Sequence, residues 1–156
     1  MTAAIPAETV NVALGDRAYD ILIGPGLLAE AGRHVAAVLP GTRAAIVTDE
    51  NVARHHLATV KESLNEAGIE ATGIIVAPGE PSKRFETLQD VVYRILDARL
   101  ERGDVVIALG GGVAIGLAAR YPDRIRRMVA TSPATGGAPA ARERMLERAK
   151  GVEENG

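Results

Sequence analysis

Residues 105–113 read VVIALGGGV, and this stretch decides the fold. Its apolar half predicts a buried strand, and the three glycines at 110–112 end that strand where a helical pattern begins at Val113. At such a junction, bare backbone N–H groups and the positive end of a helix dipole point to one spot, which suits a phosphate or pyrophosphate. The alternative is a tight strand-to-helix turn without a ligand. The run is not the dinucleotide fingerprint G-x-G-x-x-G, because its sixth position is Ile115.

Strands and helices alternate along the chain before this junction. Apolar spacing and turn residues predict a β-hairpin of residues 10–14 and 19–23 around a turn at 15–17, a helix at 27–39, a strand at 44–47, a helix at 51–67, a strand at 71–76, a loop at 78–83, a helix at 85–100 and a strand at 104–109. Such alternation favours βαβ crossovers. We therefore expect an α/β fold: a three-layer sandwich with a mostly parallel, Rossmann-like sheet and an N-terminal β-hairpin.

The pattern continues after the glycines. It predicts a helix at 113–120, a strand at 125–130 that lies parallel beside strand 104–109, a charged helix at 140–150 and a frayed tail at 151–156. The length of 156 residues fits a single α/β domain with one core.

Composition excludes several classes of partner. The formal net charge is −2 and the basic residues are scattered, so neither nucleic acid nor an anionic membrane is expected as a partner. The absence of cysteine excludes disulfides and thiolate metal sites, and no signal peptide or long apolar run is present, so a cytoplasmic protein is expected. The histidines, His34, His55 and His56, have no second ligand at metal-binding spacing, and no metal site is expected.

Three short motifs lie where predicted strands end, which is where parallel sheets bind their ligands. They read TDENV at 48–52, PGEPSK at 78–83 and LGGGV at 109–113. In this order and spacing they resemble the N-terminal, NAD-binding half of 3-dehydroquinate synthase, the second enzyme of the shikimate pathway, over residues 10–113. The family is a NAD- and zinc-dependent phosphate lyase.

The resemblance implies a cofactor site. Asp49 and Asn51 would lie near the adenosine of NAD. Glu80 and Lys83 would hold ribose hydroxyls, because a carboxylate can accept hydrogen bonds from them. The pyrophosphate would lie against the backbone of Gly110, Gly111, Gly112 and Val113. The alternative for Asp49 and Glu80 is a solvated loop cap without a ligand.

Beyond Val113 the chain departs from that family. The family aspartate after the glycines is missing, and residues 110–133 instead resemble an α/β-hydrolase just after its nucleophile elbow. This predicts a chimera of a synthase-like part (1–112) and a hydrolase-like part (113–150). The elbow pattern G-x-S-x-G, laid on the chain to end at Gly110, puts Ala108 at the nucleophile, and Ser132 has no histidine in a plausible relation to it. No catalytic residue is therefore predicted.

Two classes of function remain open. The first is a catalytically inert chimeric or engineered domain that retains part of a NAD site, binding NAD weakly or not at all, with a phosphate or sulfate ion on Gly111, Gly112 and Val113 as the favoured occupant. The second is an enzyme, either a 3-dehydroquinate synthase-related lyase fragment or a hydrolase-like protein without its nucleophile. The resemblance also implies a helical C-terminal domain with the zinc ligands, which this sequence does not include, and a partner chain that supplies it stays open as well.

Overall fold

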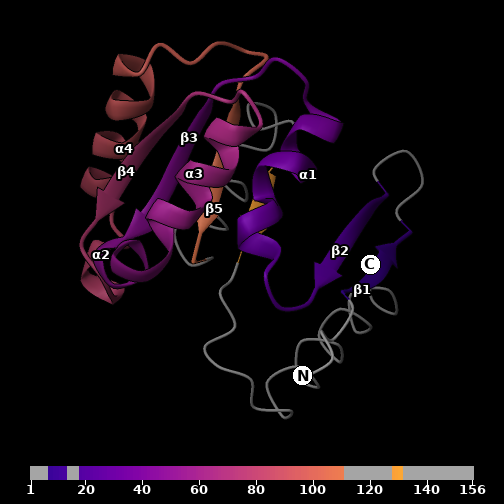
Figure 1. The fold of residues 1–156 in the computed structure, drawn as a ribbon. Coiled ribbons are helices and arrows are strands. Elements are labelled where there is room, and N and C mark those ends of the chain that lie inside the picture. Colours follow the sequence, from indigo (N-terminus) through magenta and orange to yellow (C-terminus); the bar gives the residue numbers. More distant parts are fainter. Residues whose placement is uncertain (1–6, 14–17, 111–127, 132–156) are drawn as a thin grey trace. The chain divides into compact units, whose positions relative to one another are not determined.

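The computed structural model describes residues 7–13, 18–110 and 128–131 (Figure 1). The chain divides into two compact units, one of Met1–Leu27 with Ala134–Gly156 and one of Leu28–Pro133. The predicted helices at 113–120 and 140–150, the tail and the junction at 112/113 lie outside the described residues. The single domain therefore stays a prediction. No helix of the described part is long and apolar enough to cross a membrane.

The N-terminal unit contains the expected β-hairpin. Strand β1 (Glu8–Val12) pairs antiparallel with β2 (Tyr19–Ile23), with Val10 opposite Ile21. The Asn11 side chain donates a hydrogen bond to Asp20 Oδ1 at 2.8 Å across the pair. The first strand begins and ends two residues earlier than predicted, and the turn at 15–17 lies outside the described residues.

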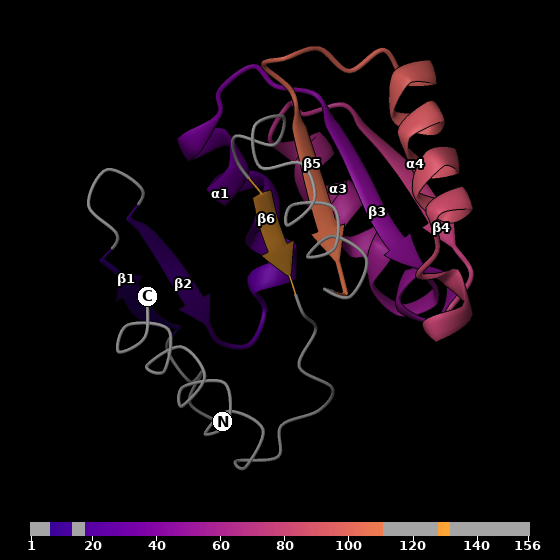
Figure 2. The same cartoon turned by 180° about the vertical axis from the view of Figure 1, so that it is seen from behind.

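The second unit is built on a parallel sheet with strand order β4-β3-β5-β6 (Figure 2). Its strands are β3 (Ala44–Asp49), β4 (Ala71–Val76), β5 (Val105–Leu109) and β6 (Met128–Thr131). β6 lies parallel beside β5, which confirms the neighbour predicted for strand 104–109 but with the strand shifted from 125–130. Apolar residues on both faces of β3 explain why it takes the central position.

Helices cover both faces of this sheet. One face packs against η2 (Leu27–Glu30), α1 (Ala31–Val38), α2 (Glu50–Val52), η3 (Ala53–Leu57, a π-helical turn) and α3 (Ala58–Glu66). The other face packs against α4 (Phe85–Asp97), which the short 3-10 helix η4 (Glu80–Ser82) precedes. The three expected layers are confirmed within this unit.

Alternate residues of each strand feed two separate cores. On β3, Ile46 faces the α1/α3 side with Ile107 and Leu64, whereas Val47 faces the α4 side with Ile74 and Val91. These side chains are essentially inaccessible to water. A period of two on strands buried on both faces is what a three-layer sandwich requires.

Helix α4 ends three residues earlier than predicted. Arg99 has a φ of +53°, a left-handed conformation that reverses the chain after the helix. The sequence has no glycine at this position to indicate the end. The apolar Leu100 belongs to the core beyond the turn, which made the helical pattern look longer.

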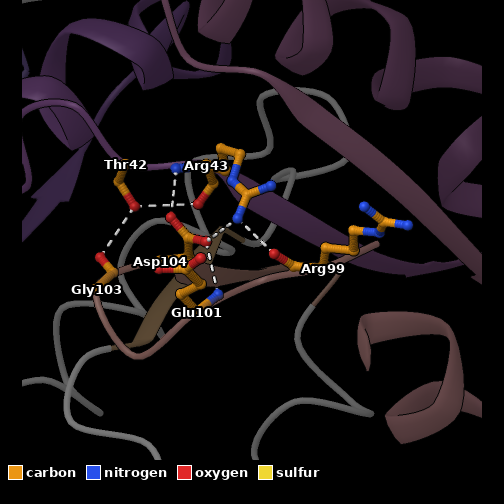
Figure 3. Close-up of polar contacts among 6 residues, drawn as sticks. All are labelled: Thr42, Arg43, Arg99, Glu101, Gly103 and Asp104. Atoms are coloured by element: carbon orange, nitrogen blue, oxygen red, sulfur yellow. Dashed lines mark hydrogen bonds and ion pairs between the residues drawn. The ribbon is translucent and has the colours of Figure 1, made fainter. Parts of the chain in front are cut away.

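A polar cluster joins the amino ends of β3 and β5 (Figure 3). Asp104 Oδ1 accepts the backbone N–H of Arg43 at 2.8 Å, and its Oδ2 accepts that of Glu101 at 2.7 Å and lies 3.2 Å from the Arg43 guanidinium. The guanidinium also donates to the Arg99 carbonyl, and Thr42 Oγ1 donates to the Gly103 carbonyl at 3.2 Å. Burial alone raises the pKa of Asp104, but these hydrogen bonds and the Arg43 charge together hold it below its ordinary value.

We expect Asp104→Asn to lower the free energy of unfolding by about 2 kcal/mol at neutral pH, because an amide nitrogen cannot accept the Glu101 N–H or pair with Arg43. The stabilisation by Asp104 is fully present above the ordinary aspartate pKa of about 4, and is lost as pH falls through the lower folded-state value. Urea unfolding of both proteins between neutral and acidic pH checks this. A difference that does not shrink in acid would contradict it.

Candidate functional site

The carboxyl ends of β3, β4 and β5 bring the predicted motifs to one edge of the sheet. Asp49 is the last residue of β3 and is in register with Val76 of β4, from which the chain enters the 78–83 motif. Thr48 is in register with Leu109 of β5, so Gly110 follows at the same edge. Gly111, Gly112 and Val113 lie outside the described residues.

Asp49 caps the helix that follows it. Its Oδ1 accepts the backbone N–H groups of Asn51 at 2.9 Å and Val52 at 3.1 Å, and its backbone is extended, as an N-cap requires. The side chain is partly buried, whereas Asn51 is exposed. Asp49 is therefore a helix cap, as the interpretation without a ligand predicts. The cap uses only Oδ1, so the other carboxylate oxygen, Oδ2, takes no part in it.

Gly110 is required by both its backbone and its neighbour. Its φ is +94°, and a Cβ placed there would lie 2.9 Å from Val52 Cγ2, closer than real Cβ contacts. The tight-turn interpretation thus accounts for this glycine. It also leaves bare backbone at the carboxyl edge beside the cap of α2.

The 78–83 motif forms a hydrogen-bonded loop with exposed charges. Gly79 adopts φ +89° and ψ −179°, which favours glycine, and Ser82 Oγ donates to its carbonyl at 2.6 Å. The Lys83 ammonium pairs with the Glu80 carboxylate, and the two side chains are 50% and 82% exposed. The loop therefore presents one carboxylate and one ammonium to solvent.

Two supporting residues escaped the sequence prediction. Ser82 is buried and fastens the loop, and Val52 packs against Gly110. A serine three residues after a glycine is a signal for such a side chain-to-backbone turn. The contact of Val52 with Gly110 joins residues far apart in sequence, so it had no local signal.

Within the part of the chain that the structure describes, the hydrolase-type positions show no reactive arrangement. Ala108 lies buried inside β5, opposite Val47 of β3, rather than on an exposed turn. Ser132 lies outside the described residues. His34 Nε2 is 3.7 Å from Glu30, and the rings of His55 and His56 are 6.1 Å apart.

Most of the chain matches one known protein family. Residues 18–121 match the family described as iron-containing alcohol dehydrogenase. The chain belongs to this family. The match crosses the predicted junction at 112/113, and the comparisons do not show a hydrolase-like fragment after it.

Curated relatives of high identity are 3-dehydroquinate synthases. The enzyme of Mesorhizobium japonicum is 65% identical over 105 residues, which is 67% of this chain and 28% of that enzyme. The enzyme of Brucella ovis is 55% identical over 126 residues, which is 81% of this chain and 33% of that enzyme. The chain thus spans about a third of the length of these relatives.

Solved structures share the fold. A crystal structure of 2-deoxy-scyllo-inosose synthase with carbaglucose-6-phosphate, NAD+ and Co2+ matches with a TM-score of 0.68 at 16% identity, over 80% of this chain and 34% of that one. The structure of 2-epi-5-epi-valiolone synthase from Streptomyces hygroscopicus subsp. jinggangensis 5008, with NAD+ and Zn2+ bound, matches with a TM-score of 0.56 at 28% identity, over 77% of this chain and 32% of that one. The Rossmann-like prediction is confirmed.

The expectation of no metal is not supported by these neighbours, since both hold a metal ion. The described residues nevertheless contain no group of three or more His, Cys, Asp or Glu side chains placed to bind one. The residues of this part of the chain therefore do not fit a metal centre, and no ligand is assigned.

Proposed function

We propose that this chain is the NAD-binding part of a 3-dehydroquinate synthase or a related sugar-phosphate cyclase, and that it acts in the cytoplasm. The observation that carries the proposal is the meeting of the 48–52 and 78–83 motifs with Leu109 and Gly110 at one sheet edge, in a chain 65% identical to such a synthase over 105 residues. Ligands of parallel sheets bind at this edge. The absence of cysteine agrees with a reducing compartment.

The donor set at this edge fits NAD. Glu80 offers an exposed carboxylate that can accept hydrogen bonds from two ribose hydroxyls, and the Lys83 ammonium beside it can donate a hydrogen bond to a ribose oxygen. Exchanging their exposed ion pair for ribose contacts costs little, because such pairs are weakly stabilising in water. When bound, NAD supplies a hydride acceptor.

The remaining contacts concern the adenosine and the pyrophosphate. Asp49 keeps Oδ1 on the backbone of α2, so Oδ2 would face the adenosine side together with Asn51. The backbone at Gly110, and with it Gly111, Gly112 and Val113, would face the pyrophosphate. A free phosphate or sulfate ion would use the same backbone groups.

We expect NAD to bind the chain in the high micromolar to millimolar range, and Glu80→Ala to weaken binding about tenfold, since a hydrogen-bonded charge is lost. Isothermal titration calorimetry with NAD measures both proteins. Glu66→Ala, at an exposed position at the end of α3, is the control and should bind like the unmodified chain. Submicromolar binding, or equal binding by the Glu80 variant, would show that the site is wrong.

The comparisons do not support the chimera with a hydrolase-like part at 113–150 or its catalytic inertness, so both stay predictions. We expect no hydrolysis of p-nitrophenyl esters by the chain, nor by Ala108→Ser, because a serine buried inside β5 without a base is not activated. Ester turnover that follows the protein through purification from an esterase-deficient host would overturn this expectation.

A further inference from the structure

The outer edge of β4 is free among the described strands, because β4 is the terminal strand of its sheet (Figure 1). Ala44 N–H bonds to the Glu70 carbonyl, and in a parallel pair the backbone groups of successive residues point to opposite sides. The even-numbered residues of β4 therefore face β3. Ala71, Gly73 and Ile75 present their N–H and C=O groups outward.

β4 itself contains none of the residues that commonly keep another strand from adding to a free edge. β4 reads ATGIIV, with no charged residue, no proline and two adjacent isoleucines. Exposed edges of this kind are templates for adding another strand, and proteins commonly protect them with a charge. Ile75 is 40% exposed, so its side chain does not keep a second strand away.

The missing charge comes from helix α4. Arg94 Nη1 donates to the outward carbonyl of Ile75 at 3.3 Å, and Arg94 Nε is 3.0 Å from Asp90 Oδ2 one turn earlier in the helix. Asp90 thus holds the guanidinium where its Nη1 reaches the strand edge. An added strand has to displace Arg94 from the Ile75 carbonyl and remove water from its charge.

We propose that Arg94, positioned by Asp90, blocks the free edge of β4 against addition of β4 from a second copy of this chain. A second copy fits because antiparallel pairing of two identical edges is symmetric, so each copy offers what the other needs. Pairing centred on Gly73 joins the outward groups of both strands and sets Ile75 opposite Ala71 of the second copy. Because β4 has no charged residue, no like charges from the two strands would face each other in this pairing.

The test compares the self-association of the full chain and of Arg94→Ala by sedimentation velocity over a wide range of concentrations. We expect the variant to associate at least about tenfold more tightly than the unmodified chain. Arg33→Ala is the matched control, because Arg33 is also an exposed helical arginine, paired with Glu30 three residues earlier and outside the edge. Equal association of Arg94→Ala and Arg33→Ala would overturn the proposal.

Two further variants locate the contact. Arg94→Ala/Ile75→Lys returns a charge to the edge and is expected to return association to the unmodified level. Asp90→Ala removes the group that accepts from Arg94 Nε and is expected to give an intermediate increase. Hydrogen exchange of the full chain checks the edge directly, since the Gly73 and Ile75 amides should gain protection only in the associated Arg94→Ala protein. Association that persists in the double variant, or that occurs without that protection, uses another surface and overturns the proposal. Circular dichroism confirms that each variant is folded.

Discussion

Gly32→Ala is expected to destabilise the second unit by about 3 kcal/mol or more, because helices α1 and α3 touch at this residue. A Cβ on Gly32 would lie 2.0 Å from the Ser63 carbonyl oxygen and 2.6 Å from its carbon, both backbone atoms of α3. The same contact carries two hydrogen bonds: Gly32 N–H donates to Ser63 Oγ at 3.0 Å, and Ser63 Oγ donates to the Ala29 carbonyl at 2.8 Å. An added methyl group forces the helices apart and breaks this bridge.

Urea unfolding followed by circular dichroism measures the loss. Gly103→Ala is the control, because a Cβ at Gly103 meets nothing within 4 Å. Ser63→Ala separates the bridge from the close approach: it leaves a buried N–H without its acceptor, which costs about 1–3 kcal/mol, while the helices keep their distance. A Gly32→Ala protein as stable as Gly103→Ala would contradict the close-approach explanation.

The fold was largely predictable because its signals are local. The predicted strand at 71–76 has the observed bounds, and the strand at 104–109 begins one residue early, since apolar runs between turn residues mark strands buried on both faces. The end of α4 was not predictable. Arg99 takes a conformation that sequence patterns assign to glycine, and only the contacts of the Arg43 and Asp104 cluster with the chain after α4 show why the turn lies there.

The candidate site was predictable in place but not in detail. The rule that parallel strands end at one edge brought Asp49, Glu80 and Gly110 together without any structure. The partner of each group was not predictable, because Asp49 caps α2, Glu80 pairs with Lys83 and Gly110 contacts Val52. Gly32 illustrates the same limit. In sequence it only weakens a helix, whereas its role depends on a helix that lies 31 residues further along the chain.

Gly110→Ala is the second change with a large expected effect, because two independent terms oppose a side chain there. The φ of +94° strains any residue with a Cβ, and the 2.9 Å approach to Val52 Cγ2 adds a clash with a stiff, β-branched side chain. We expect the free energy of unfolding to fall by about 2–4 kcal/mol, from about 1–3 kcal/mol of backbone strain and about 1 kcal/mol of packing cost at Val52.

A double-mutant cycle with Val52→Ala separates these two terms. Removing the Val52 methyl groups relieves the clash but leaves φ unchanged, so the double variant should recover about 1 kcal/mol relative to the sum of the single changes, and not more. The unmodified chain, both single variants and the double variant are unfolded in urea under one set of conditions. Strict additivity would show that Val52 does not set the space at Gly110. Complete recovery would show that the backbone there is not strained and that the clash with Val52 alone excludes a side chain at Gly110.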